Sequence, residues 1–158
     1  MPILTKLREF LEQEKVAYSV HSHPEAYTAL EIAALEHVKG RMLAKVVIVK
    51  TDPGELVMIV LPADRRVDFR KVAAVLGTEE LRLGHESEFR DRFPGCEVGA
   101  MPPFGNLFGL PVLADEQLAD NDEIVFNAGT HTLTAKLRFA DFKRLVRPRI
   151  ASFSQPIG

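Results

Sequence analysis

The sequence contains one cysteine, Cys96, and no tryptophan among its 158 residues. A single cysteine excludes an internal disulfide, so stability must come from packing, as suits a reducing compartment. Charge of neither sign dominates, because 20 lysines and arginines are balanced by 22 aspartates and glutamates, a formal net charge of −2. The chain therefore has no global field to attract a polyanion, and any contact with nucleic acid must be local.

Long apolar runs are also missing. The longest, around residues 42–49, contains Lys45 and falls well short of the roughly 20 residues that a membrane span needs. The first ten residues carry Lys6, Arg8 and Glu9 between apolar positions, which is typical of an amphipathic helix and lacks the apolar centre of a signal peptide. The sequence therefore predicts a cytoplasmic protein with no membrane contact.

Signatures of several large enzyme classes are absent. The chain has no Gly-x-Ser-x-Gly elbow, no phosphate-binding Gly-x-x-x-x-Gly-Lys-Ser/Thr loop and no dinucleotide fingerprint. His21 and His23 are spaced like two ligands on one strand face, but no third ligand of suitable type and spacing follows. These absences disfavour covalent catalysis, nucleotide hydrolysis and hydride transfer, and we expect neither a metal nor a cofactor.

What the sequence does contain is an alternation of helical and strand patterns. Apolar periodicity and capping signals predict helices over the first dozen residues and over 28–40, 67–76, 86–93 and 139–146. Apolar and alternating runs predict strands over 16–21, 43–49, 56–61, 81–83, 112–114, 123–127 and 132–137. Interleaved helices and hairpins predict a mixed α/β (α+β) fold, a single compact domain over residues 1–158 with a curved, mixed, barrel-like sheet flanked by helices.

Lys45 is the most informative single residue. It lies inside the apolar strand 43–49, where its ammonium must either point into a polar cavity or bear a large desolvation cost. A solvated strand face, or a side-chain stem that reaches the surface, is equally compatible with the pattern. Two groups of basic residues could contact phosphate, although solvated helix faces commonly carry such groups. They are Arg65, Arg66, Arg70 and Lys71, and Lys143, Arg144, Arg147 and Arg149.

Residues 95–111 form a segment rich in glycine and proline, with the run Gly-Ala-Met-Pro-Pro-Phe-Gly at 99–105. Such a loop can hold backbone N–H groups rigidly toward a ligand oxygen, as an oxyanion site requires. A tight structural loop is the alternative. His131 follows Gly129 in a turn between two strands, where a side chain either overhangs a pocket or lies on the surface.

Four segments, taken together and in order, resemble the YbaK family. They are His23-Pro24 with Thr28, the strand 43–50, the loop 99–105, and Phe126-Asn127-Ala128-Gly129. That family includes the editing insertion domain of bacterial prolyl-tRNA synthetase, and the resemblance spans residues 18–145. It implies a compact mixed α/β domain that hydrolyses the ester between a mischarged amino acid and the terminal adenosine of tRNA, usually tRNA for proline.

The resemblance also implies roles for particular residues. Lys45 matches the family's essential lysine and would hold the terminal adenosine phosphate or the substrate carbonyl. The family's Gly-x-x-x-Pro loop matches Gly99 through Pro103, whose N–H groups would stabilise the developing oxyanion. A water assisted by the free ribose hydroxyl would attack without a protein base. The substrate-binding residues implied by the same match are Thr28, Ala100, Met101, Phe104, Gly105, Asp115, Gly129 and His131.

The expected partner is the acceptor end of mischarged tRNA carrying alanine, cysteine or serine, with prolyl-tRNA synthetase or an elongation factor as further candidates. The residues around the loop do not assign one amino acid. Two other classes stay open: a non-catalytic module that binds an aminoacyl, nucleotide or protein ligand, and a hydrolase of small free esters. Basic residues beside the cavity that holds Lys45 would favour tRNA.

Overall fold

The computed structural model describes residues 4–157 as alternating helices and strands. The α-helices are α1 (Thr5–Gln13), α2 (Ala29–Leu35), α3 (Phe69–Leu76), α4 (Glu86–Phe89) and α5 (Phe139–Val146). The strands are β1 (Ser19–Ser22), β2 (Ala44–Thr51), β3 (Leu56–Pro62), β4 (Arg65–Val67), β5 (Leu81–Leu83), β6 (Val112–Asp115), β7 (Glu123–Asn127), β8 (Leu133–Arg138), β9 (Arg149–Ala151) and β10 (Ser154–Pro156). Short 3-10 helices are η1 (Gly40–Met42), η2 (Arg90–Arg92), η3 (Gly105–Phe108) and η4 (Glu116–Asp120).

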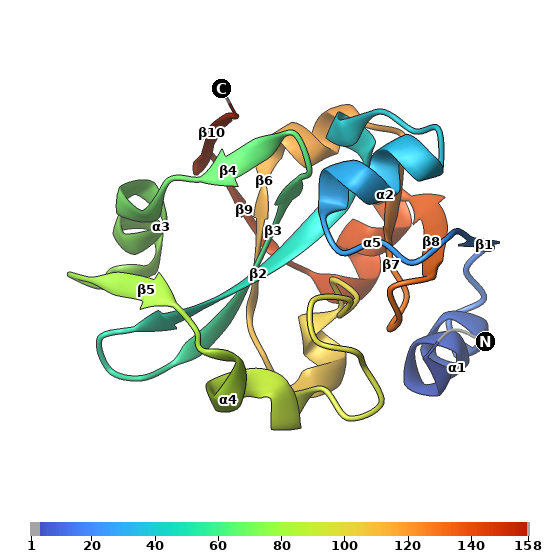
Figure 1. Ribbon diagram of the computed structural model, residues 1–158. Coiled ribbons are helices and arrows are strands. Elements are labelled where there is room, and N and C mark those ends of the chain that lie inside the picture. Colours follow the sequence, from blue (N-terminus) through green and yellow to red (C-terminus); the bar gives the residue numbers. More distant parts are fainter. Residues whose placement is uncertain (1–3, 158) are drawn as a thin grey trace.

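The strands form two main sheets and a short ribbon. One sheet has five strands in the order β5-β2-β3-β6-β9, the other has the order β1-β8-β7, and β10 pairs with β4. A single parallel bridge between Leu43 and Val125 brings the start of β2 beside β7, so the sheets curve around a shared core (Figure 1). The mixed fold and curved sheet that the sequence predicts are confirmed, but the sheet is not closed into a barrel.

The central hairpin of β2 and β3 is the best-predicted part of the fold. All seven residues of β3 are buried, which explains its uninterrupted apolar sequence. Its turn contains Gly54 at φ +93°, a left-handed conformation that glycine adopts without steric cost. Antiparallel pairing runs from Ala44 opposite Pro62 to Lys50 opposite Leu56, and this register fixes which β2 side chains face the core.

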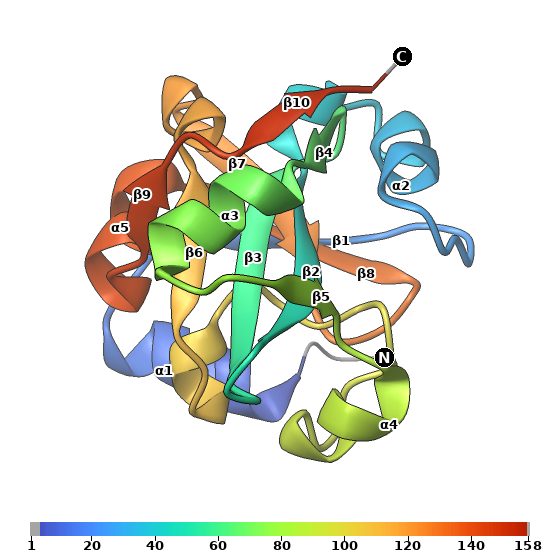
Figure 2. The same ribbon diagram turned by 90° about the vertical axis from the view of Figure 1, so that its left-hand side faces the viewer.

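A helix covers one face of the five-stranded sheet, and the second sheet packs over the other. Figure 2 shows α3 lying across β3 and β6, where Val72 packs on Ile59 and Leu61. On the other face a larger core, which includes Phe104, Phe126 and other aromatic residues, fills the space between the sheets. Helix α2 has a small core of its own over the start of β2 and β7. None of the helices described is both long and apolar enough to cross a bilayer.

Several element boundaries differ from the sequence prediction. Helix α2 ends at Leu35 rather than Gly40, because His37 adopts a left-handed conformation (φ +56°) and the chain turns before η1. The helix predicted over 86–93 divides into α4 and η2. Strands β4, β9 and β10 were not predicted, since each has only three residues and pairs with a partner distant in sequence.

Candidate active site

Lys45 lies on the face of β2 that is turned away from the main core. Side chains alternate along a strand, so Ala44 and Val46 point into that core and Lys45 points to the other side. There it lines an open groove of about 540 Å³. The groove is lined by Lys45, Val47, Arg66, Val67, Phe69, Leu83 and Gln155. The sequence left open a cavity or a solvated face for Lys45, and the structure gives a groove that is open to solvent on one side.

The groove is positively charged. Burial lowers the pKa of Lys45, and the nearby Asp64 carboxylate offsets part of this effect. The Lys45 ammonium donates to the Ala63 carbonyl oxygen at 3.3 Å, and within residues 4–157 it forms no ion pair. Arg66 is the other charged lining residue, and no carboxylate from residues 4–157 lines the groove. A half-buried ammonium that forms no ion pair in this range is suited to bind an anionic or strongly polar ligand.

The Gly99 loop is fastened to the turn between β7 and β8. The Glu97 N–H donates to Gly129 O at 2.8 Å, and the Gly129 N–H donates to Ala100 O at 3.0 Å. The Ala100 N–H is also occupied, by Glu97 O at 3.0 Å. The Gly99 N–H makes no hydrogen bond to any residue in the described range. Of the neighbouring N–H groups of Gly99 and Ala100, that of Gly99 therefore remains free for a substrate oxygen.

The sheet register relates this loop to Lys45. Lys45 lies two residues beyond Leu43 in β2, and Asn127 lies two residues beyond Val125 in β7, so both are on the same face next to the Leu43–Val125 bridge. The Asn127 Nδ2 donates to Gly99 O at 3.4 Å. The Gly99 loop is thus bonded to the end of β7, and Val125 of the same strand is bridged to Leu43, two residues before Lys45.

His131 also contacts this loop. Its Nε2 donates to the Val98 carbonyl oxygen at 2.9 Å, and its ring packs on Tyr27 with centroids 4.7 Å apart. A methyl group built on Gly99, which has φ +87°, would lie 3.4 Å from His131 Cε1. Although it follows a turn, His131 is only 8% exposed. The structure therefore places Gly99, Gly129 and His131 together.

Other residues implied by the family resemblance have structural environments of their own. Phe104 packs against Phe126 and Phe142 in the main core, where Met101 also lies. Ala100 is fully buried, and a methyl group on Gly105 would come within 2.6 Å of Val112 Cγ2. Side chains of this part of the loop therefore anchor it in the core. Any contact they make with a substrate must come from the backbone, and Pro103 has no N–H to offer.

Thr28 and Asp115 cap helical segments. The Thr28 hydroxyl accepts from the Glu31 N–H at 3.2 Å, the N-terminal cap of α2. One Asp115 carboxylate oxygen accepts from the Gln117 N–H and the other from the Phe153 N–H, each at 3.1 Å. By the strand register, Asp115 in β6 and Lys45 in β2 lie at the same height of the sheet, and strand β3 runs between them. These contacts give both residues a structural role, and their contact with substrate stays a prediction.

The two basic groups differ in their relation to the groove. Arg66 lines it, whereas the neighbouring Arg65 donates to Ser154 Oγ at 2.6 Å. In the second group Arg144 pairs with Asp141 at 3.4 Å and Arg149 donates to Val75 O at 2.7 Å. None of the second group lines the groove. The first group therefore contributes one arginine beside Lys45.

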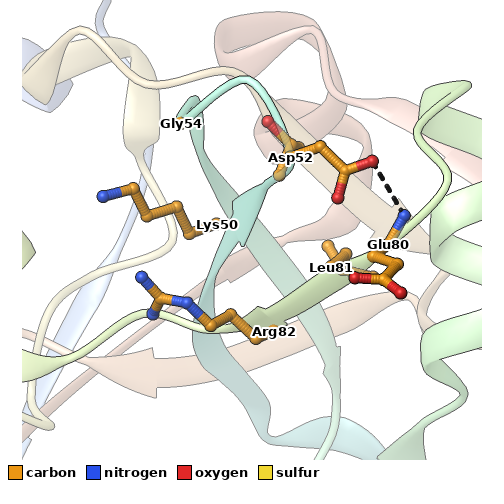
Figure 3. Close-up of a pocket in the computed structure, with 7 residues that line it drawn as sticks. Lys50, Asp52, Gly54, Glu80, Leu81 and Arg82 are labelled. Carbon is orange, nitrogen blue, oxygen red and sulfur yellow. Dashed lines mark hydrogen bonds between the residues drawn. The ribbon is translucent and has the colours of Figure 1, made fainter.

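A second pocket lies at the far end of the same hairpin (Figure 3). Lys50 and Arg82 border it on one side, and Asp52 accepts a hydrogen bond from the Glu80 N–H at 3.0 Å on the other. Both cations pair with one carboxylate, that of Glu88. Their hydrogen bonds hold the pKa of Glu88 far below its ordinary value. The two cations of this pocket are thus paired within the protein.

Cys96 is not part of the site chemistry. The thiol is half-buried, and burial raises its pKa to about 11. A nucleophilic cysteine needs an accessible thiolate near neutral pH. The structure therefore agrees with the sequence in giving no support to covalent catalysis by this residue.

Comparison with known proteins assigns the family. The aminoacyl-tRNA editing domain profile matches residues 23–145. The chain belongs to this editing-domain family. Its resemblance to the YbaK family and to prolyl-tRNA synthetase editing domains is thereby confirmed. The members of this family are hydrolases, and this editing domain is therefore an aminoacyl-tRNA deacylase.

Individual relatives cover the editing domain to different extents. The chain is 32% identical over 155 residues to the multifunctional Ser/Thr-tRNA deacylase ProXp-y of Escherichia coli K12. The matched region covers 94% of this chain and 90% of that deacylase. The chain is 30% identical over 108 residues to the proline–tRNA ligase of Aquifex aeolicus, 68% of this chain but 18% of the ligase. A solved structure titled a putative trans-editing enzyme for prolyl-tRNA synthetase has the same fold, with TM-score 0.82 and 22% identity over 95% of both chains.

The sequence did not predict every residue of the site. Phe69 and Leu83 border the groove and are 38% and 55% exposed. In the sequence each belongs to the apolar pattern of a predicted helix or strand, which does not indicate a binding site. Asn127 was noted only as part of a motif. Its contact with Gly99 depends on a loop 28 residues away, for which a single sequence contains no local signal.

Proposed function

We propose that this protein is a trans-editing enzyme that hydrolyses the ester of mischarged aminoacyl-tRNA in the cytoplasm, acting as a single domain over residues 1–158. The observation that carries the proposal is the groove at Lys45. Two cations, Lys45 and Arg66, lie beside the apolar side chains of Phe69 and Leu83, and no carboxylate lines the groove. Phosphates and stacked bases of a single-stranded acceptor end have the complementary charge and shape.

In this proposal Lys45 binds the phosphate of the terminal adenosine or the carbonyl of the ester. The free Gly99 N–H, fixed by the bonds between the loop and Gly129, stabilises the negative charge that develops on the carbonyl oxygen. A water molecule attacks the carbonyl carbon, the ribose oxygen leaves, and the neighbouring ribose hydroxyl transfers the proton. His131 and Gly129 border the amino-acid side of this site.

The substrate is proposed to be a small noncognate residue on tRNA for proline, with alanine, cysteine and serine as candidates. ProXp-y, matched over 90% of its length, is named a Ser/Thr-tRNA deacylase, which adds tRNAs charged with serine or threonine to the set. Serine belongs to both sets and is the first to be tested. Prolyl-tRNA synthetase and an elongation factor are the proposed protein partners, since either would present the acceptor end.

The test is release of amino acid from tRNA for proline charged separately with alanine, cysteine, serine or proline, and from tRNA for threonine charged with serine or threonine. Wild type and Lys45→Ala are compared, with Lys50→Ala as a control on the same strand. We expect rapid release of at least one noncognate residue by the wild type and by Lys50→Ala. The release should be lost in Lys45→Ala.

The same assay separates the rival functions. Binding of charged tRNA without release would indicate a non-catalytic module. Hydrolysis of small aminoacyl esters at rates equal to those for charged tRNA, with no effect of Arg66→Ala, would indicate a small-ester hydrolase. The position of Arg66 in the groove favours the tRNA substrate over both.

A further inference from the structure

Two hydrogen-bond acceptors that flank Gly99 have no donor among residues 4–157. They are Asn127 Oδ1 and His131 Nδ1, and both atoms are buried. A buried acceptor without a partner costs free energy, and most such groups in native proteins are paired. His23 Nε2 is also unpartnered, and the His23 N–H donates to Thr132 O at 2.9 Å beside the same turn. Asn127 and His131, however, are the two that bond to the Gly99 loop, at Gly99 O and Val98 O, and they form the pair to be explained.

The hydrogen bonds that these side chains do make determine their chemistry. The Val98 carbonyl oxygen can only accept, so His131 Nε2 carries a proton, and in the tautomer that has its one proton on Nε2 the lone pair is on Nδ1. In the same way Gly99 O accepts from Asn127 Nδ2, which leaves Oδ1 as the free acceptor. Both free atoms accept hydrogen bonds, so the missing ligand must donate.

The charge around the pair indicates the kind of donor. Glu97 Oε2 lies 3.8 Å from His131 Nε2, which adds negative charge on this side of the loop. The cation Lys45 lies two residues beyond Leu43 and Asn127 two residues beyond Val125, the two residues that form the bridge between the sheets. An ester placed between them would have its carbonyl near Lys45 and the Gly99 N–H, and its other end near the two acceptors.

We propose that Asn127 Oδ1 and His131 Nδ1 bind the α-amino group of the aminoacyl moiety. That group has at least two N–H donors whether or not it is protonated, one for each acceptor. The inference rests on the proposed deacylase function and makes it specific: the enzyme recognises an aminoacyl ester by its amino group, in addition to the size of its side chain. Asn127 is then a substrate-binding residue that also fixes the position of Gly99.

The experiment compares seryl-tRNA for proline with 3-hydroxypropionyl-tRNA, in which hydrogen replaces the amino group. Each enzymatic rate is divided by the uncatalysed rate of the same ester, because the amino group itself activates the ester. We expect the wild type to accelerate seryl release about 10- to 100-fold more than release of the deamino ester, the range for hydrogen bonds to a charged group.

Three variants identify the role of Asn127. Asn127→Leu keeps the approximate volume and removes both the acceptor and the hydrogen bond to Gly99 O. Both esters should therefore be released more slowly, and the seryl ester should lose more than the deamino ester, so that the preference disappears. Asn127→Asp keeps an acceptor and should keep the preference. Asn106→Leu, at an exposed asparagine in η3, is the control and should behave as wild type. Circular dichroism and thermal melting verify that each variant is folded.

The outcomes are distinct. Equal slowing of both esters by Asn127→Leu would overturn the inference, since the residue would then only position the Gly99 loop. Equal acceleration of both esters by the wild type would also overturn it, while leaving the deacylase function intact. If the wild type released no serine, and no amino acid from any of the other charged tRNAs, the proposed function would be overturned and this inference with it.

Discussion

Lys45 and Lys50 lie five positions apart on the same strand and have opposite environments. Lys50 forms an ion pair with Glu88, which Arg82 also contacts, and it borders a pocket whose two cations share that one carboxylate. Lys45 is half-buried in an apolar groove and has no ion-pair partner within the described residues. An odd spacing on a strand puts the two side chains on opposite faces. The same residue type thus has a structural role at one end of the hairpin, and at the other it borders an open groove without an ion-pair partner among residues 4–157.

The largest effect we expect is on catalysis by Lys45→Ala. Loss of one group that stabilises developing charge lowers the rate by about 10²–10³-fold, and kcat/KM for charged tRNA should fall by that factor. Lys50→Ala should leave kcat/KM within about twofold, because a partly buried ion pair at the far end of the strand has little influence on a distant site. Equal losses in the two variants, measured under single-turnover conditions, would refute the contrast between the lysines.

A smaller effect is expected for Arg66→Ala. Its guanidinium borders the groove and would contact a phosphate in an exposed position, so KM for charged tRNA should rise about three- to fivefold with kcat unchanged. The dependence of binding on salt should weaken by about one unit of slope. Arg144→Ala, in the basic group outside the groove, is the matched control. An equal change in that variant would mean that charge alone, and not the groove, determines binding.

The lowered pKa of Lys45 predicts a pH effect on binding. A lysine whose pKa lies below the ordinary value of 10.5 loses its charge earlier as pH rises. Affinity for uncharged tRNA should therefore begin to fall below pH 10.5, and Lys45→Arg should retain its affinity over the same range because guanidinium stays protonated. Uncharged tRNA is used because alkali hydrolyses the aminoacyl ester. A flat affinity profile in the wild type would contradict a role of the ammonium in binding.

The smallest effect concerns stability at the Lys50 end. The pKa of Glu88 is lowered from its ordinary 4.5, so ionised Glu88 stabilises the fold above that pH, and this stability is lost as pH falls toward the folded-state pKa. Glu88→Gln should unfold at lower urea concentration than wild type near neutral pH, and the difference should shrink below pH 4.5. Activity at neutral pH should not change. A difference that is constant with pH would contradict the ion-pair explanation.

The success of sequence analysis depended on how local each signal was. The central hairpin was predicted because β2 and β3 have their own apolar runs and a glycine turn between them. Strand β4 was missed because it is defined by pairing with β10, about 90 residues away. Lys45 was noticed because a charge in an apolar strand is anomalous wherever its partners lie.

The site shows the same limit. A loop motif identifies Gly99 and Pro103, but only packing shows that Phe104 points into the core. The contact of Asn127 with Gly99 depends on the position of a loop that is 28 residues away in the sequence. Backbone spacing therefore predicted which segments meet, whereas the direction of each side chain required the structure.

The most direct test of the groove as the substrate site is amine labelling of Lys45 and Lys50 in the same sample. Both lysines are modified by a water-soluble acylating reagent, with and without an uncharged tRNA acceptor-stem minihelix, and the extent is read by peptide mass spectrometry. The minihelix should protect Lys45 and leave Lys50 unchanged. Unchanged labelling of Lys45 at a saturating minihelix concentration would contradict the assignment of the groove as the place where tRNA binds.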